Sequence, residues 1–321
     1  MNARTDRIAL MFPGQGAQYP GMGLPWLDTP QWQLVDALSH RVGRDVGALL
    51  VDADTERLRR TDNAQLALFA LEAMILQAVR AAAPGLPVVA CAGHGVGEYA
   101  ALAAAGVLKP ADAAQLVAER GAAMADAARA AEGAMAVLTG GDPQAAGRLT
   151  ERLRGAGARV WLAHLDGPDR VVVSGTRAGV EALVEQAPEA GFRATPHPSG
   201  GAFHSPLMIP AQYRLSAALV RAPLRAARFP VVATADGRVR DGDPAEWRAL
   251  MIRHLVEPVR WDSTVRTLVG PDSAAAELIE LGPGTTLADL ARRIAPDTPA
   301  TTVTTPAQVA ALATRYAAER V

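Results

Sequence analysis

The sequence predicts an α/β protein in which a smaller subdomain, residues 132–199, is inserted into a large domain formed by residues 1–131 and 200–321. Two observations support this prediction. Strands alternate with helices in the large domain, and the insertion has the order β-α-β-β-α-β. At 321 residues the chain is long enough to bury a substantial core. Because half the residues are hydrophobic and only 4% are aromatic, we expect a core mainly of Ala, Leu and Val.

The first part of the large domain carries the clearest alternation. We expect a strand at Arg7 to Phe12, followed by a loop at 13–18 whose two glycines let the backbone approach a ligand closely. Helical spacing follows from Asp62 to Val79, and Leu86 to Cys91 is an apolar run typical of a strand buried on both faces. This run leads directly into the glycine-rich segment 93–99 and an alanine-rich helix.

The insertion follows a ferredoxin-like order, in about the length that such a unit needs. Its expected strands and helices lie at 134–138, 143–153, 160–165, 170–174, 179–186 and 192–196. After it, the large domain resumes with a loop at 199–210, a long helix, a strand at 230–234 and an apolar run at 278–281.

Charge and composition exclude several classes of function. The formal net charge of −1 gives no reason to expect nucleic acid or an anionic membrane as a partner. The apolar run Ile8 to Phe12 is too short for a signal peptide, and the alanine-rich stretch 64–83 is interrupted by polar residues, so we interpret it as a buried helix. We therefore expect a cytoplasmic protein. Cys91, the only cysteine, excludes an internal disulfide and a cysteine cluster for metal binding.

The turn Gly93-His94-Gly95-Val96-Gly97 has the form of a nucleophile elbow without its nucleophile. In acyl-transfer enzymes a serine stands at the centre of Gly-x-Ser-x-Gly between a strand and a helix. Here that position is Gly95. Glycine turns before helices also bind phosphate, but a dinucleotide fingerprint requires a different glycine spacing. The elbow is the better interpretation.

Over residues 12 to about 287 the chain resembles the malonyl-CoA:acyl-carrier-protein transacylases and polyketide-synthase acyltransferases of the discrete, trans-acting type. The motifs that carry the resemblance are Phe12-Pro13-Gly14-Gln15-Gly16-Ala17-Gln18, Gly93-His94-Gly95-Val96-Gly97-Glu98, Arg120-Gly121, Gly201-Ala202-Phe203-His204-Ser205-Pro206-Leu207-Met208, Pro258-Val259-Arg260-Trp261 and Gly282-Pro283-Gly284.

The resemblance implies an α/β-hydrolase-like large domain with a ferredoxin-like subdomain. It also implies action on malonyl-type acyl thioesters of coenzyme A and acyl carrier protein, in polyketide or fatty-acid biosynthesis. The coenzyme A thioester would be the substrate, with no bound cofactor and no metal. The expected partners are acyl-CoA and the phosphopantetheine arm of an acyl carrier protein.

The resemblance assigns a role to each matched residue. His204 corresponds to the general base, a task suited to imidazole. The backbone amides of Gln15 and Val96 would form the oxyanion hole. Arg120 matches an arginine that pairs with the free carboxylate of malonyl-type acyl groups. Phe203 and Val96 resemble choices associated with malonyl, and Gln65 resembles a pocket-lining glutamine, although an ordinary residue at a helix N-terminus is an equal alternative.

Several residues depart from the family pattern. His164 and Asp166 replace two asparagines of the inserted subdomain. They are either a new acid-base pair or ordinary surface residues, and from the sequence we favour the surface interpretation. His197, Ser199 and Gly200 also differ, as does His254, where glutamine is common.

Gly95 is compatible with three hypotheses about function. The chain is an inactivated mutant of a transacylase, a naturally divergent homologue such as a hydrolase with His204 as base, or a non-catalytic scaffold that docks carrier proteins. Cys91, inside a buried strand, is expected to be structural rather than a substitute nucleophile. Glycine at an elbow position should also relieve backbone strain, so we expect Gly95 to stabilise the turn.

Overall fold

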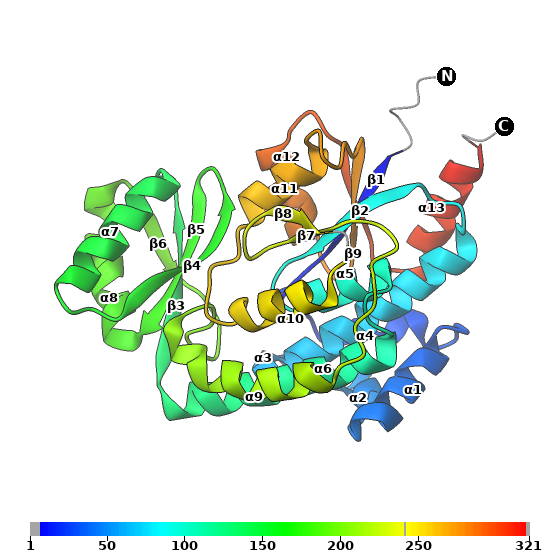
Figure 1. Ribbon diagram of the computed structural model, residues 1–321, viewed down its shortest axis with the longest axis horizontal. Coiled ribbons are helices and arrows are strands. Elements are labelled where there is room, and N and C mark those ends of the chain that lie inside the picture. The colour runs from blue at the N-terminus through cyan, green and yellow to red at the C-terminus, as the bar shows by residue number, and fades with distance from the viewer. Residues whose placement is uncertain (1–6, 241, 319–321) are drawn as a thin grey trace.

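The apolar runs of the large domain form a six-stranded sheet in the computed structural model, which describes residues 7–240 and 242–318 (Figure 1). The strand order is β10-β9-β1-β2-β7-β8, parallel except for the antiparallel pair β7 and β8. The strands are β1 (Ile8–Phe12), β2 (Val88–Gly93), β7 (Val231–Ala233), β8 (Arg238–Arg240), β9 (Glu277–Leu281) and β10 (Ala300–Val303).

Alternate residues of β1 enter two cores because successive strand side chains point to opposite faces. Ile8, Leu10 and Phe12 belong to the larger core, and Ala9 and Met11 to the smaller one. The larger core is covered by α1 (Trp32–Val42), α2 (Val46–Val51), α4 (Thr61–Ala82), α5 (Gly97–Ala105), α6 (Pro110–Ala130), α9 (Ile209–Arg221), α10 (Pro244–Arg253) and α13 (Pro306–Ala318). The smaller core is covered by α11 (Trp261–Val269) and α12 (Thr286–Ile294).

Shorter helices complete the large domain: η1 (Leu24–Trp26), α3 (Thr55–Arg59) and η3 (Pro206–Met208). Helix α4 is long and apolar enough to cross a membrane by length and composition alone. In the fold, 83% of its most apolar window is buried inside the protein, where it packs against α6. This agrees with the interpretation of 64–83 as part of a buried helix.

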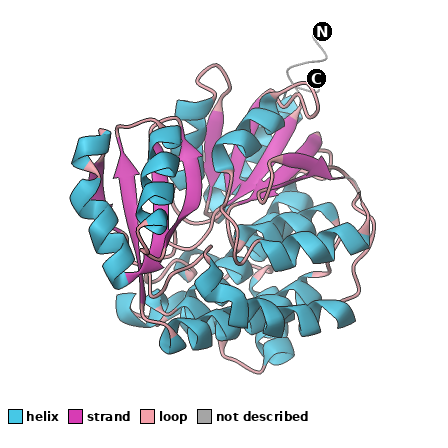
Figure 2. Cartoon of the chain, turned by 60° about the vertical axis from the view of Figure 1, so that its left-hand side comes forward, coloured by secondary structure: helices cyan, strands magenta, loops and turns pink. Residues whose placement is uncertain are grey.

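The insertion folds as the ferredoxin-like subdomain that the sequence predicts. Its elements are β3 (Gly133–Thr139), α7 (Pro143–Gly155), β4 (Val160–Gly167), β5 (Arg170–Thr176), α8 (Arg177–Gln186), η2 (Pro188–Ala190) and β6 (Arg193–Pro196). The antiparallel sheet has the order β4-β5-β3-β6, and α7 and α8 pack on it through a separate apolar cluster. Figure 2 shows the two sheets as separate groups of strands side by side.

Edge strand β4 connects the subdomain to the large domain. The Leu165 amide donates to the Val259 carbonyl at 2.8 Å, and the Val259 amide donates to the Ala163 carbonyl at 2.9 Å. His164 lies between these two hydrogen bonds, in a parallel bridge with Val259. The backbone at His164 is therefore fixed against the large domain.

Candidate active site

The turn from β2 into α5 is as tight as the glycine pattern predicts. A Cβ on Gly93 would lie 2.0 Å from the Gly97 carbonyl carbon, and a Cβ on Gly97 would lie 2.2 Å from the Phe12 carbonyl oxygen. No side chain fits at either position. Gly95 differs: its φ is +58°, but a Cβ there would meet only His204 Nε2, at 3.9 Å. A side chain at Gly95 would therefore face backbone strain but no steric clash.

The ring of His204 points one nitrogen at Gly95 and fixes the other on backbone carbonyls. Nδ1 lies 2.8 Å from the His254 carbonyl oxygen and 3.3 Å from that of Glu257. Because carbonyls only accept hydrogen bonds, Nδ1 carries the proton and Nε2 presents its lone pair. Burial, and then neighbours that include His254 and Arg120, hold the pKa of His204 well below its ordinary value. His204 is thus a neutral base at neutral pH.

A buried network ties this base to the elbow helix. His254 Nδ1 lies 2.9 Å from Glu98 Oε2, and His254 Nε2 lies 3.1 Å from Thr234 Oγ1. The Thr234 amide donates to Glu98 Oε1 at 3.1 Å. Burial alone would raise the pKa of Glu98, but His254 and Thr234 outweigh it, so that pKa lies below its ordinary value. An ionised Glu98 on α5 therefore holds the residue whose carbonyl orients His204.

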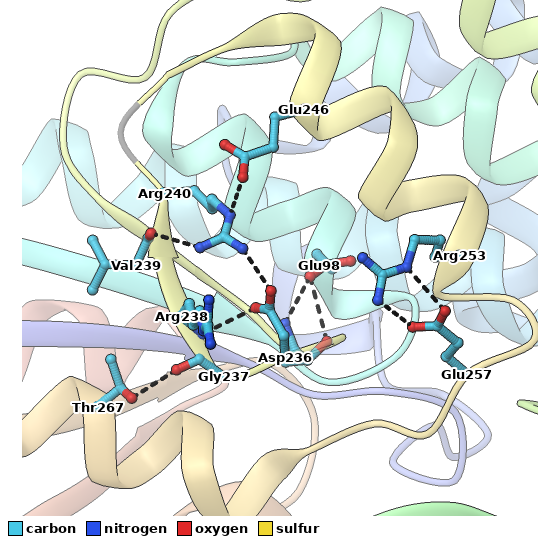
Figure 3. A network of polar contacts seen from close by, with 11 residues as sticks. Glu98, Asp236, Gly237, Arg238, Val239, Arg240, Glu246, Arg253, Glu257 and Thr267 are labelled. Atoms are coloured by element: carbon cyan, nitrogen blue, oxygen red, sulfur yellow. Dashed lines mark hydrogen bonds and ion pairs between the residues drawn. The ribbon is translucent and has the colours of Figure 1, made fainter.

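Ion pairs on the outer side of this network hold the second carbonyl acceptor. Arg253 binds both carboxylate oxygens of Glu257, at 2.9 and 2.8 Å. Figure 3 shows this pair beside Glu98, with the Asp236–Arg240 pair on the other side of Glu98. The Arg253–Glu257 pair spans the turn after α10, which presents the Glu257 carbonyl to His204.

Arg120 is a buried cation facing the cavity. It is 2% exposed on α6, its Nη1 donates to Gln65 Oε1, and its guanidinium lies 5.9 Å from the centre of the Tyr99 ring. Among the described residues no carboxylate forms an ion pair with it. Burial lowers the pKa of Arg120, but a guanidinium stays charged at neutral pH. A buried cation without a counter-ion favours an anionic ligand in the cavity.

Gln65 supports the site from behind. It is fully buried and does not line the cavity itself, but it contacts Arg120, which does. Its role in substrate binding stays a prediction. Its Nε2 donates to Thr61 Oγ1 at 2.8 Å, and Thr61 Oγ1 donates to Gln15 Oε1 at 2.9 Å. With the hydrogen bond from Arg120 to Gln65, this chain of hydrogen bonds joins Arg120 to the Gln15 loop.

The two backbone amides expected at the oxyanion hole are available. Within the described part of the chain, neither the Gln15 nor the Val96 N–H has a hydrogen-bond acceptor. Both residues line the cavity, and Val96 caps the N-terminus of α5, where the helix dipole favours negative charge. The geometry is suited to binding an oxyanion beside Gly95.

Asp166 is buried and His164 is largely enclosed, so the expectation that they are surface replacements is wrong. Their side chains are 12% and 5% exposed, and Asp166 is shared by three cations or potential cations. Asp166 Oδ1 lies 3.0 Å from His94 Nε2, and Oδ2 lies 3.3 Å from Arg170 Nε and 3.9 Å from His164 Nδ1. Burial, followed by the neighbouring His94, holds the pKa of His164 well below its ordinary value. The altered residues therefore form one cluster with His94.

Comparison with known proteins shows which family has this fold. The family model described as an acyl transferase domain matches residues 10–316. The chain belongs to the acyl transferase family. It is 35% identical over 292 residues to the malonyl CoA-acyl carrier protein transacylase of Bacillus subtilis, covering 90% of each chain. Its fold is similar to that of the MCAT of Mycobacterium tuberculosis, with a TM-score of 0.89, 32% identity and 96% and 99% coverage.

A second solved structure is a malonyl-transacylase in complex with its type II polyketide-synthase acyl-carrier protein. The TM-score is 0.90 at 30% identity, and the match covers 96% of this chain and 99% of that one. The relatives thus include malonyl CoA-acyl carrier protein transacylases and a malonyl-transacylase of a type II polyketide synthase. The acyltransferase fold, with its inserted subdomain, was correctly predicted.

The cavity of this acyltransferase, about 180 Å³, brings most of the predicted residues together. It is lined by Gln15, Gly95, Val96, Arg120, His164, Phe203 and His204. Asp166 lies on an adjoining cavity that shares His94 and His164 with the first.

Cys91 is buried, and its thiol donates to the Ala101 carbonyl at 3.3 Å. Burial raises the pKa of that thiol, so Cys91 is no substitute nucleophile.

Sequence reasoning missed the position of His94 and His197. His94 was part of the recognised motif but had no role, and in the structure it contacts Asp166. His197 lines both cavities, and its buried Nδ1 has no partner among the described residues. The signal in the sequence was the set of departures from the family pattern, four of which (His164, Asp166, His197 and Ser199) line one or both of these cavities.

Proposed function

We propose that this protein binds a malonyl-type acyl thioester of coenzyme A or an acyl carrier protein, in fatty-acid or polyketide biosynthesis, and acts on it without an acyl-serine intermediate. The observation that carries the proposal is the gap between Gly95 and His204 Nε2. It leaves a base beside two free backbone amides, where a side-chain nucleophile is missing. The names and similarity of the relatives support the substrate class.

Arg120 is the residue that would select the acyl group. A free carboxylate would neutralise its buried guanidinium and accept two parallel hydrogen bonds. An acetyl group offers no such acceptor. The cavity therefore favours a dicarboxylic acyl group over a monocarboxylic one, in agreement with the malonyl transacylases to which the chain is similar.

The chemistry that fits the gap is hydrolysis by a His204-activated water. Nε2 takes a proton from water, and the water oxygen attacks the thioester carbonyl carbon. The tetrahedral oxyanion accepts hydrogen bonds from the Gln15 and Val96 amides. The carbon–sulfur bond then breaks, and the thiol leaves with the proton that His204 held. The products are the free acid and the coenzyme A or phosphopantetheine thiol.

An acyl carrier protein is the proposed macromolecular partner, since one relative was solved in complex with its own. We also propose a cytoplasmic location, because the one helix of the described residues that is long and apolar enough to span a membrane is buried in the core. The proposed hydrolysis requires no cofactor.

Release of free thiol from malonyl-CoA, with and without a holo carrier protein, tests the proposal. We expect slow release by the unchanged chain and a loss of about 10²–10⁴-fold in His204→Ala, the usual contribution of a general base. His40→Ala, in the exposed part of α1, is the matched control. Binding of malonyl-CoA without any thiol release would contradict hydrolysis and favour a scaffold. Release only in Gly95→Ser would instead indicate an inactivated transacylase.

A further inference from the structure

The junction of the elbow with β4 gathers three metal-ligating side chains that the proposed function does not use. His94 comes from the elbow, while His164 and Asp166 stand two residues apart on β4. One donor atom from each of the three lies within 4.8 Å of the others. Two of the separations are 3.0 Å, from His94 Nε2 to Asp166 Oδ1, and 3.9 Å, from His164 Nδ1 to Asp166 Oδ2.

These separations are close to those of a coordinated ion. Donors about 2.1 Å from a tetrahedral ion are about 3.4 Å apart. The His94 separation, measured to Asp166 Oδ1, is slightly shorter than that value, and the His164 separation, measured to Oδ2, is slightly longer. Two imidazoles and one carboxylate are a common donor set for divalent transition metals.

The hydrogen bonds around the cluster leave room for an ion. Neither ring nitrogen of His164 has a hydrogen-bond partner among the residues that the structure describes. Arg170 Nε donates to Asp166 Oδ2 at 3.3 Å, and Oδ1 lies 3.0 Å from His94 Nε2. An ion bound by Oδ1 and His94 Nε2 would replace the contact between these two atoms, while Arg170 holds Oδ2. Ligating carboxylates are commonly held by such an outer partner. The backbone bridge of His164 to Val259 fixes its strand, so the donors stand on a rigid element.

The cluster is buried but faces the cavity. The side chains of His94 and His164 are 11% and 12% exposed, and both line the cavity that contains Gly95 and His204. An ion held by three protein ligands keeps at least one coordination position, and here that position would open toward Gly95. Sites of this kind bind water or a carbonyl oxygen of a substrate.

We propose that His94, His164 and Asp166 form a binding site for a divalent transition-metal ion, Zn²⁺ in the first place, with an open coordination position toward the cavity. This revises the expectation from the sequence that the chain binds no metal. The proposal does not depend on the proposed function, because binding is measured without substrate. His197 lines the same two cavities, and its buried Nδ1 has no hydrogen-bond partner among the described residues, but it lies outside the group of three donors.

Titration of the chelator-treated protein with Co²⁺, followed by visible absorption and Zn²⁺ competition, tests the site. We expect one equivalent of Co²⁺ to bind with the visible bands of a four- or five-coordinate ion and to be displaced by Zn²⁺. His164→Asn and Asp166→Asn, which restore the residue type common in the family, should each weaken binding by more than the roughly 10–100-fold that loss of an outer partner costs. His197→Asn should have a smaller effect.

His40→Asn on α1 serves as the control and should leave Co²⁺ binding unchanged. The unfolding transition of each variant shows that it is folded before its affinity is compared. Absence of stoichiometric Co²⁺ and Zn²⁺ binding by the unchanged chain would overturn the proposal. So would equal affinity in the unchanged chain and in folded His164→Asn and Asp166→Asn.

Discussion

The two sides of the cavity are built in different ways. On the large-domain side, Arg120 and His204 are oriented by neutral partners, a glutamine oxygen and backbone carbonyls, and each leaves a functional nitrogen toward the cavity. On the subdomain side, His94, His164 and Arg170 all converge on one carboxylate, Asp166. Arg120 and His204 match the family motifs, whereas His164 and Asp166 depart from them. This difference is the basis of our proposal that substrate binding is retained while the chemistry beside Gly95 has changed.

The largest effect is expected when the buried cation on the large-domain side, Arg120, is removed. Arg120→Gln should raise KM for malonyl-CoA, or abolish detectable binding, because a charged hydrogen bond to the substrate carboxylate contributes about 1.5–3 kcal/mol. That free energy corresponds to a factor of about 10–150 in binding. Acetyl-CoA, which lacks the second carboxylate, is the internal control. An equal effect on both thioesters would show that Arg120 does not bind that carboxylate.

The second prediction concerns the elbow that separates the two sides. Because Gly95 has φ +58°, Gly95→Ser should lower the free energy of unfolding by on the order of 1–3 kcal/mol. Nothing but His204 Nε2 lies within 4 Å of the new Cβ, so strain and not a clash is the cause. Urea unfolding of the two proteins measures the difference. Equal stability would contradict the claim that glycine relieves backbone strain in this turn.

The third prediction concerns the support of the large-domain side. Glu72 is fully buried on α4, and neither of its carboxylate oxygens has a hydrogen-bond partner among the described residues. Burial, and then Glu280, raise its pKa well above the ordinary value. An acid with a raised pKa destabilises the fold increasingly as pH rises above its unfolded value.

Glu72→Met should therefore stabilise the protein by about 1 kcal/mol or more, and by more at pH 8 than at pH 5. Thermal unfolding at the two pH values measures this, with Glu185→Gln on the exposed face of α8 as the control. A gain that is the same at both pH values would mean that Glu72 is not held protonated.

Much of the large-domain side could be predicted because its information is local. The apolar runs set β1 and β2, and the glycines at 93 and 97 fix the elbow because any Cβ there would collide with backbone. Strands β8 and β10 were missed, since runs of three and four residues at the sheet edges carry little periodicity. Their pairing depends on neighbours far along the chain.

The subdomain side could not be predicted in the same way. His94 and Asp166 are 72 residues apart, and their contact depends on how β4 docks against the large domain through Val259. Burial could not be predicted either. From the sequence His164 was expected at the surface, but in the fold its ring contacts the rings of His94 and His204. For Gln65, only the packing shows that it is fully buried and accepts a hydrogen bond from Arg120.

The most direct test is the intact mass of the protein after incubation with malonyl-CoA, for the unchanged chain and for Gly95→Ser. If the cavity retains its acyl-binding and oxyanion geometry and lacks only the nucleophile, a covalent acyl adduct should form on Gly95→Ser and not on the unchanged chain. A covalent adduct on the unchanged chain would contradict the account, because another residue would then be the nucleophile. Absence of an adduct on folded Gly95→Ser would equally contradict it, because the retained side of the cavity would no longer support acyl transfer.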